Sequence, residues 1–175
     1  MRIFTVKGDI PDAILQAWLD KAKQEGWAAS CVEDDDGLTL TSALGIVLPN
    51  STVGQSLRRH GFVMLTDLEG VPVEQFLTLL AEGKMLIERS LVGVFQAMAD
   101  RNIGFADGDP EDFMAITVRP EHFGIRFYKI LKRTGLLSYA LTARLSDEFF
   151  KKHVQYFGGK TIETLRLWQA EYLKR

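Results

Sequence analysis

Residues 72–101 have the sequence PVEQFLTLLAEGKMLIERSLVGVFQAMADR, and this stretch decides the fold of the second half of the chain. Its apolar side chains recur every three or four positions, which places them on one face of a helix. Gly83 interrupts the pattern once, so the stretch predicts two helices, over residues 72–82 and 84–101. The second helix has an apolar face wide enough to be largely buried. The stretch therefore predicts a helical hairpin in the protein core.

Two helices joined by a short turn with a glycine are also the outline of a DNA-binding helix-turn-helix. In that motif the second helix exposes polar side chains to the edges of the bases. Residues 86–98 are instead dominated by leucine, isoleucine, valine, phenylalanine and methionine. Placing such a helix in the polar groove of DNA would be costly, so the hairpin is predicted to be structural.

The residues before this hairpin show short β-like segments separated by turns. Residues 28–42 fit a β-hairpin, because the arms are joined by Asp34-Asp35-Asp36-Gly37 and an Asp-Gly pair suits a tight turn. A short helix is predicted over residues 52–60. Further strands are predicted at residues 3–6, 44–48, 62–65 and 113–118.

Strands that come first and helices that come later favour an α+β fold. We therefore expect a mixed or antiparallel sheet from the N-terminal half, packed against a helix-rich C-terminal half. A chain of 175 residues suits a single globular domain. Within residues 1–175, we expect a β-rich lobe over about residues 1–70 and a helical lobe over about residues 71–175.

Three more helices are predicted after the hairpin, over residues 120–133, 146–157 and 161–174. Ser146 is expected to cap the second of them, because a serine hydroxyl can accept a hydrogen bond from a free backbone N–H. Asp147 and Glu148 follow in its first turn, where the helix dipole favours negative charge. Gly158 and Gly159 separate this helix from the last one.

The net charge of −2 hides an uneven distribution along the chain. Residues 119–175 contain 12 Lys and Arg against 5 Asp and Glu, which gives +7. Residues 1–118 contain 9 Lys and Arg against 18 Asp and Glu, which gives −9. A division of this kind indicates an electrostatic role for the basic segment, but it does not determine the fold.

The most concentrated part of the basic segment is the predicted helix over residues 120–133. At 100° per residue, four of its side chains fall within about 60° of one another. Arg119 precedes the helix and extends the basic character. The candidate partner- or anion-binding residues are therefore Arg119, His122, Arg126, Lys129 and Arg133.

Two environments fit this basic stripe. It can face an anionic partner, such as an acidic protein surface or phosphate groups. It can also face acidic side chains of this same chain, and the turn at residues 33–36 and the loop at residues 107–112 are the acidic clusters available. The near balance of the two charges favours the second environment slightly.

Several chemistries lack their usual sequence patterns. The single cysteine, Cys31, cannot form an intramolecular disulfide or a cysteine-rich zinc site. Phosphate-binding glycine loops and the nucleophile elbow of hydrolases are missing from the sequence. The loop at residues 107–112 fails the calcium-loop pattern, because its sixth position is Asp112 instead of glycine. We therefore predict no cofactor, no metal site and no catalytic residue.

Location follows from the same kind of argument. The longest apolar run, residues 91–99, is about half of what a membrane span needs, and the first residues do not resemble a signal peptide. We therefore predict a soluble, cytoplasmic protein that does not cross a membrane. The sequence does not define an oligomeric state.

Three functions are compatible with these features. The first is a non-catalytic binding or inhibitory protein that regulates another protein through charged surfaces. The second is a nucleic-acid-associated protein that uses the basic helix, although an isoelectric point of about 5.9 argues against it. The third is a small enzyme acting on an anionic substrate, with Arg126 and His122 beside a carboxylate from residues 107–112. The first is preferred, because no catalytic pattern supports the third.

Overall fold

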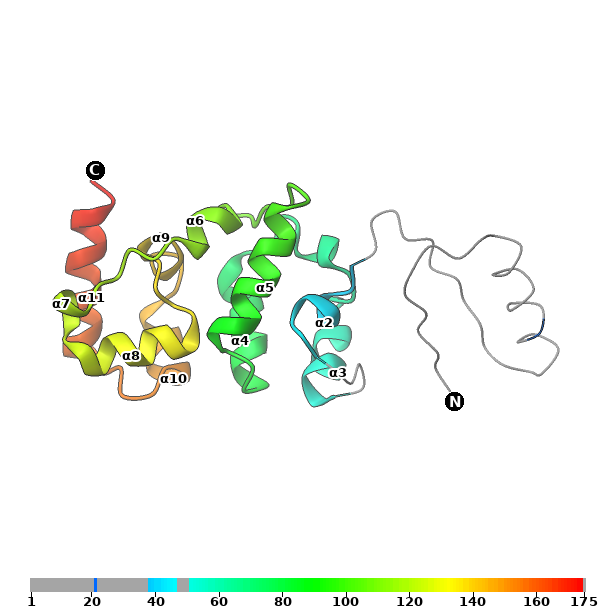
Figure 1. The fold of residues 1–175 in the computed structure, drawn as a ribbon. Helices are drawn as coiled ribbons and strands as arrows, with labels where there is room; N and C mark the ends of the chain where they lie inside the picture. Colours follow the sequence, from blue (N-terminus) through cyan, green and yellow to red (C-terminus); the bar gives the residue numbers. More distant parts are fainter. Residues whose placement is uncertain (1–20, 22–37, 47–50, 175) are drawn as a thin grey trace. The chain divides into compact units, whose positions relative to one another are not determined.

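The computed structural model describes residues 21, 38–46 and 51–174 of the 175-residue chain. By its internal contacts, the chain divides into two units, residues 1–37 and residues 38–175. Except for Lys21, the described residues all belong to the second unit, which Figure 1 shows as a set of packed helices. Four features of the sequence lie outside the described residues: the strand predicted at residues 3–6, the first arm of the predicted β-hairpin, Cys31 and the acidic turn at residues 33–36.

Helices α4 (Val73–Glu82) and α5 (Glu88–Ala99) lie at the centre of the second unit, which confirms the predicted helical pair. Their apolar faces are buried, as the spacing predicts: Phe76 and Leu80 on α4 and Val94 and Met98 on α5 are all inaccessible to solvent. The start of α5 differs from the prediction, because the helix begins at Glu88 and not at residue 84.

The turn between α4 and α5 explains this late start. The Lys84 N–H donates to the Ala81 carbonyl at 3.0 Å, and the Met85 N–H donates to the Leu80 carbonyl at 2.8 Å. These two bonds form a Schellman motif, in which the residue after the helix cap takes a left-handed conformation. That residue is Lys84, with a φ of 57°. The chain therefore leaves the helix at this point and forms a new one only at Glu88.

Four phenylalanine rings join this pair of helices to α6 (Pro110–Met114). The ring centroids of Phe76, Phe95 and Phe113 lie 5.8–6.1 Å from that of Phe105, and all four side chains are buried. Aromatic pairs at such distances contribute about 0.5–1.5 kcal/mol each beyond the burial of their area. Phe105 therefore ties the loop after α5 to the core of the unit.

Shorter elements cover the other side of the central pair. Helices α2 (Leu40–Ala43) and η1 (Leu65–Leu68) pack against α5, and α3 (Thr52–Arg59) packs against α4. The helix predicted over residues 52–60 is thereby confirmed. Its cap is Ser51, whose hydroxyl accepts a hydrogen bond from the Gly54 N–H at 3.1 Å.

The prediction of an α+β fold with a mixed or antiparallel sheet is wrong. The described residues are helix-rich and contain no strand or sheet. Their only β-type pairings are two isolated antiparallel bridges, Thr39 with Met64 and Phe105 with Gly108. The packing partner of the helices is therefore other helices, and not a sheet.

The segment at residues 38–42 shows why the sheet prediction failed. Its alternating Leu and Thr residues resemble a strand, and it does pair briefly with the predicted strand at residues 62–65, through Leu40 N–H to Val63 O at 2.9 Å. The Thr39 hydroxyl then accepts from the Ser42 N–H at 3.3 Å and caps a helix. A threonine side chain that binds the backbone locally competes with strand pairing, and here the helix wins.

The strand predicted at residues 113–118 is also wrong. Its first two residues belong to α6, which starts at Pro110, a residue well suited to the first turn of a helix. Its second half is extended, but the N–H groups of Thr117 and Val118 both donate to the Leu137 carbonyl, at 3.0 and 2.9 Å. Two donors that share one acceptor fix the segment without forming a ladder.

The C-terminal part consists of α7 (Pro120–Phe123), α8 (Ile125–Thr134), α9 (Tyr139–Thr142), α10 (Asp147–His153) and α11 (Gly159–Tyr172). Figure 1 shows α7, α8, α10 and α11 gathered at one end of the second unit. The predicted cap of α10 is confirmed, because the Ser146 hydroxyl accepts from the Phe149 N–H at 3.1 Å. Ser146 is itself held by Glu74 of α4, at 2.6 Å from its hydroxyl.

Within the described residues, no helix has both the length and the apolar composition that a transmembrane segment requires. The extent of one domain over residues 1–175 stays a prediction.

Gly93 provides a test of the packing between α2 and α5. A Cβ at this position would lie 2.7 Å from the Ala43 carbonyl oxygen, which is backbone and cannot rotate away. Alanine normally stabilises a helix interior by about 1 kcal/mol relative to glycine. Here we expect Gly93→Ala to lower the free energy of unfolding by about 1–3 kcal/mol, because the clash with the Ala43 carbonyl costs more than alanine gains in helix propensity.

Urea unfolding followed by circular dichroism measures this change, and the exposed α5 residue Val92, changed to alanine, serves as the control. A Gly93→Ala protein as stable as the wild type, or more stable, would show that α2 does not approach α5 so closely.

Candidate functional site

The helix predicted over residues 120–133 is broken in the structure. Gly124 has a φ of 78° and a ψ of 156°, and it separates α7 from α8. This backbone region is open essentially only to glycine, because a Cβ would collide with the neighbouring peptide groups. The prediction of one continuous helix is therefore wrong, and its basic residues are divided between two segments.

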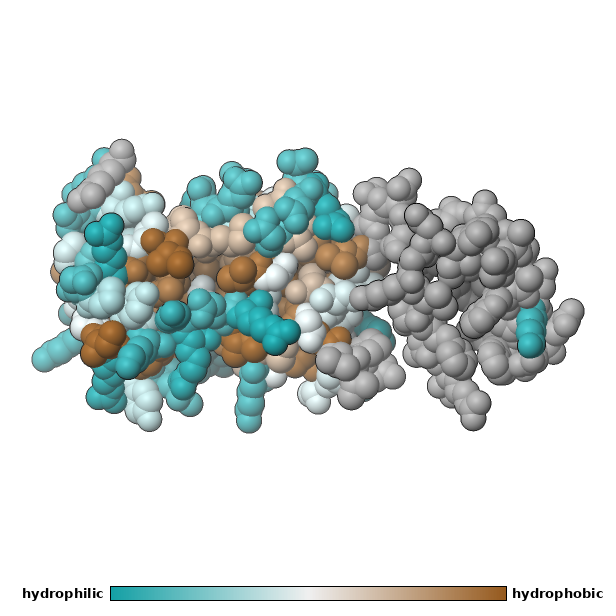
Figure 2. Space-filling model, viewed as in Figure 1, coloured by the Kyte–Doolittle hydropathy of each residue, from teal (hydrophilic) through white to brown (hydrophobic). Residues whose placement is uncertain are grey.

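Three of the predicted residues form the exposed face of α8. Arg126, Lys129 and Arg133 are all exposed, and they lie opposite Leu131, which is fully buried. Over the region that α8 occupies in Figure 1, Figure 2 shows hydrophilic side chains mixed with hydrophobic ones. In the part of the chain that the structure describes, none of the three forms an ion pair with a carboxylate. We call these three residues the basic face.

The other two predicted residues lie outside the basic face, one at the start of α7 and one within it. Arg119 is the exposed residue before α7, and its N–H donates to Nδ1 of His122 at 3.3 Å. His122 is half-buried, and its ring stacks on Trp168 of α11 with centroids 4.1 Å apart. The Trp168 indole N–H donates to the His122 carbonyl at 3.0 Å. The structure therefore places His122 in an aromatic cluster instead of among the exposed cations.

The hydrogen bonds of His122 determine its charge. Tyr139 Oη lies 2.6 Å from the same Nδ1 that receives the Arg119 N–H. Because a backbone N–H can only donate, Nδ1 must carry a lone pair, and the ring is neutral with its proton on Nε2. Burial and the nearby Arg119 charge lower the pKa of His122 below 6.5, against the opposing influence of Glu121 and Glu171. Burial likewise raises the pKa of Tyr139, so its hydroxyl remains a donor.

A neutral His122 predicts an acid-sensitive fold. Its folded pKa is lower than its unfolded value of 6.5, so the unfolded chain binds the proton more tightly. The free energy of unfolding should therefore be highest above pH 6.5 and should fall as the pH drops through the folded pKa. Urea unfolding at several pH values between about 7.5 and 5 measures this slope.

His153 contributes with the same sign, because burial and Lys152 lower its pKa too. The contribution of His122 is therefore measured as the difference in the free energy of unfolding between the wild type and His122→Gln. The variant should be less stable, and its stability should depend less steeply on pH. Equal slopes in the two proteins would contradict the assignment of a neutral, stacked His122.

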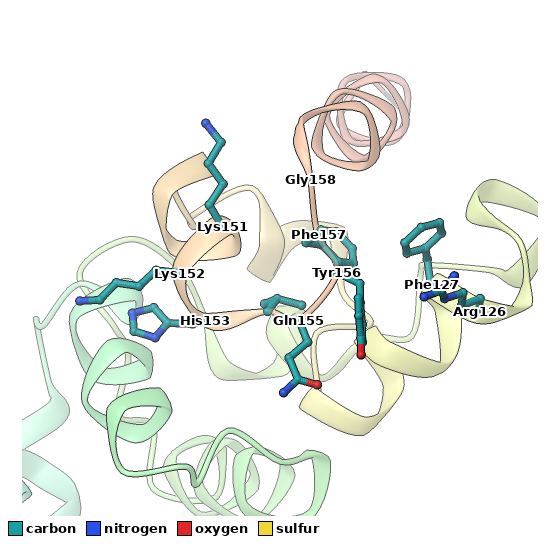
Figure 3. A pocket seen from close by; sticks show the side chains of 10 residues that line it. Arg126, Phe127, Lys151, Lys152, His153, Gln155, Tyr156, Phe157 and Gly158 are labelled. Carbon is teal, nitrogen blue, oxygen red and sulfur yellow. The ribbon is translucent and has the colours of Figure 1, made fainter.

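An open groove lies beside the basic face, between α8 and residues 151–158 (Figure 3). It has a volume of about 630 Å³, and Arg126 and Phe127 line it from α8. Lys151, Lys152 and His153 line it from the end of α10, and Figure 3 shows the two lysine side chains directed away from Arg126. Its lining includes no aspartate and no glutamate. The groove therefore joins one predicted residue, Arg126, to a set of residues from another element.

Tyr156 is the most unusual residue of the groove. It has a φ of 64°, a left-handed conformation that is rare for a residue with a bulky side chain. Its side chain is exposed, with 69% of the residue accessible to solvent. The Arg126 guanidinium lies over its ring, 5.2 Å from the centroid. The aromatic ring and the cation thus form one unit on the wall of the groove.

The cations of the groove differ in their partners. Lys152 forms an ion pair with Glu82 of α4 at 3.2 Å, between two half-exposed side chains. The lowered pKa of His153, which results from burial and from Lys152, leaves that ring neutral at pH 7. Of the described residues, no carboxylate forms an ion pair with Arg126 or Lys151. Arg126 is therefore the cation that the groove offers beside Tyr156, while the Lys151 side chain points away from these two residues in Figure 3.

The acidic loop at residues 107–112 does not lie on the basic face. Asp107 accepts a hydrogen bond from the Val73 N–H at 3.0 Å, so its charge stabilises the start of α4. No ion pair joins this loop to the basic residues in the described part of the chain. Likewise, no three histidine, cysteine or carboxylate side chains gather as a metal site in residues 38–46 or 51–174.

Sequence reasoning found Arg126 but missed Tyr156 and Lys151. Both fall in the helix predicted over residues 146–157, whereas α10 ends at His153. The basic pair Lys151-Lys152 was visible in the sequence, and its position six residues before Gly158 could have indicated a cationic helix end. The left-handed Tyr156 has no signal in the sequence, because its residue type does not favour that conformation.

No protein family, curated protein or solved structure matches the chain significantly. The function must therefore be inferred from the surface chemistry of this chain alone.

Gly124 provides the test of how the basic face is positioned. A Cβ there meets no atom within 4 Å, so the penalty of alanine is conformational only. We expect Gly124→Ala to lower the free energy of unfolding by about 1–3 kcal/mol. Gly158, where a Cβ also meets nothing but φ is −88°, is the matched control.

Alanine adopts the conformation of Gly158 without strain, so Gly158→Ala should lower the stability by less than Gly124→Ala does, and only through the weaker N-cap that alanine gives α11. Urea unfolding of the two variants measures the contrast. Equal stability would show that α7 and α8 do not need the glycine conformation between them.

Proposed function

We propose that this protein is a non-catalytic binding protein that regulates or inhibits another protein by contacting an acidic surface on it. The contact is made by the basic face, Arg126, Lys129 and Arg133. One observation supports this proposal above all: the three cations are exposed together on one helix, and no described carboxylate forms an ion pair with them. We also expect the protein to act in the cytoplasm.

Electrostatics explains why such a face favours an acidic partner. Charges of one sign on one surface accelerate the encounter with an oppositely charged surface and disfavour other partners. Arginine is well suited to this role, because its planar guanidinium can bind a carboxylate with two parallel hydrogen bonds. Two of the three residues of the basic face are arginines.

The environment of His122 favours binding over catalysis. In the enzyme hypothesis, His122 and Arg126 act together with a carboxylate of the loop at residues 107–112. His122 is instead stacked on Trp168, with Nδ1 occupied, and Asp107 caps α4. A histidine that is held this way supports the fold of the helices around the basic face.

Reversal of the basic face tests the proposal. The variant carries Arg126→Glu, Lys129→Glu and Arg133→Glu, and the control carries the same charge change at three exposed arginines elsewhere, Arg59, Arg89 and Arg144. Each protein is immobilised and used to capture partners from nuclease-treated extract of its own cells, followed by quantitative mass spectrometry. We expect a defined set of acidic proteins to be captured by the wild type and by the control, and lost with the variant.

The contrast between variant and control separates a specific surface from the effect of net charge. Capture of the same proteins by wild type and variant would contradict the proposal. So would capture that occurs only from a parallel extract without nuclease, because nucleic acid then mediates the contact. Circular dichroism of all three proteins verifies that the reversals leave the helices folded.

A further inference from the structure

We propose that the groove beside the basic face is the anchoring site for an acidic peptide segment of the partner, one that carries an aromatic side chain next to its carboxylates. This inference rests on the proposed function and assigns the chemistry of the segment that the partner supplies. It is carried by four features of the groove: its charge, its aromatic floor, its shape and the conformation of Tyr156.

The charge of the groove favours carboxylates. Arg126 and Lys151 line it without a described carboxylate partner, and the lining contains no acidic side chain. The guanidinium of Arg126 lies over the Tyr156 ring, and no described carboxylate forms an ion pair with it. A guanidinium matches the two oxygens of a carboxylate. The anchor for the acidic part of the peptide is therefore Arg126, with Lys151 at the rim.

The floor of the groove is aromatic and firmly packed. The rings of Phe127 and Phe157 meet edge to face at 6.0 Å, and Phe157 stacks on Phe150 at 5.5 Å. Phe157 and Phe150 are both buried, so these rings do not adjust freely. Of these rings, Phe127 is half-buried and lines the groove, so an aromatic side chain of a ligand can pack against its exposed part. A peptide with acidic residues alone would leave the floor unused.

The shape of the groove favours an extended chain over an enclosed small molecule. Its volume of about 630 Å³ is within the range of ligand sites, about 300–1,000 Å³. Figure 3 shows that one wall is the irregular chain after α10, with Gln155 and Tyr156 beside the opening, and the other is α8. Because the groove is open to solvent, a peptide can lie along it and continue over Lys129 and Arg133.

The conformation of Tyr156 indicates that its ring serves a purpose outside the fold. A left-handed backbone is more favourable for asparagine or glycine than for tyrosine. The ring gains little from burial, because 69% of the residue is exposed. Folding alone would thus be served as well by asparagine. Within the fold, the ring makes an exposed contact with the Arg126 guanidinium, and its outer surface is left for a ligand that binds beside Arg126.

The experiment uses the full chain and three fluorescent synthetic peptides. The first has glutamates on both sides of one phenylalanine; the second replaces the phenylalanine with alanine, and the third replaces the glutamates with glutamine. Fluorescence anisotropy at low salt measures the Kd of each peptide. We expect the first to bind about tenfold more tightly than either analogue, because it uses both the cations and the floor.

Four variants locate the site. Tyr156→Asn removes the ring but accepts the left-handed backbone, whereas Tyr156→Phe keeps the ring. We expect Tyr156→Asn and Arg126→Gln to weaken binding about tenfold, and Tyr156→Phe and the distant control Arg59→Gln to leave the Kd unchanged. Tyr156→Asn should also unfold at a urea concentration no lower than the wild type does, which separates loss of binding from loss of fold.

Several results would overturn the inference. Equal binding by Tyr156→Asn and the wild type excludes the groove, and equal binding of the first two peptides excludes an aromatic requirement. Absence of binding by all peptides contradicts it as well, and so does a single-stranded oligonucleotide that displaces the first peptide. If the reversed basic face abolishes partner capture while Tyr156→Asn does not, the groove is excluded and the proposed function stands.

Discussion

Gly124 holds φ at 78° and ψ at 156°, a combination that residues with a Cβ avoid, and it lies between two segments that would otherwise continue as one helix. Its effect is to rotate α7 away from the axis of α8. His122, on α7, can then stack on Trp168, while Arg126, on the first turn of α8, faces solvent and the groove. One backbone conformation therefore divides the predicted basic stripe into an aromatic cluster and an exposed cationic surface.

The two parts have complementary roles. The cluster of His122, Tyr139 and Trp168 connects α7, α9 and α11 through stacking and through two hydrogen bonds to His122. This connection fixes the end of the unit from which α8 presents its charges. The basic face and the groove then share Arg126, so a partner that contacts one is brought to the other. Among the described residues, no carboxylate forms an ion pair with the basic face, and Asp107 of the acidic loop instead binds the start of α4.

The sequence predicted those elements whose signals are local and strong. The pair α4 and α5 follows from apolar spacing, and the Ser146 cap follows from a side chain that binds its own backbone. The α+β prediction failed because alternation at residues 38–42 has two outcomes, and the Thr39 cap decides between them only when the helix forms. The break at Gly124 was missed for a different reason: the helical spacing of apolar residues continues on both sides of this glycine.

The candidate site was predictable only in part. Charge and spacing identified Arg126, Lys129 and Arg133, since these residues lie on α8 at helical intervals. Nothing in the sequence indicates that Tyr156 approaches Arg126, because the two are far apart along the chain and meet through the packing of other elements. The protonation and position of His122 likewise depend on Tyr139 and Trp168, which are distant in the sequence. Only the structure therefore shows that His122 lies outside the basic face.

The protonation state of His122 reports whether this residue lies in the aromatic cluster or among the exposed cations. Nitrogen-15 NMR of the imidazole ring, followed through a pH titration, reports both its pKa and its tautomer. The structure predicts a neutral ring with its proton on Nε2 at pH 7 and a pKa below 6.5. A pKa at or above 6.5, or a proton on Nδ1 at pH 7, would contradict it and would return His122 to the basic stripe.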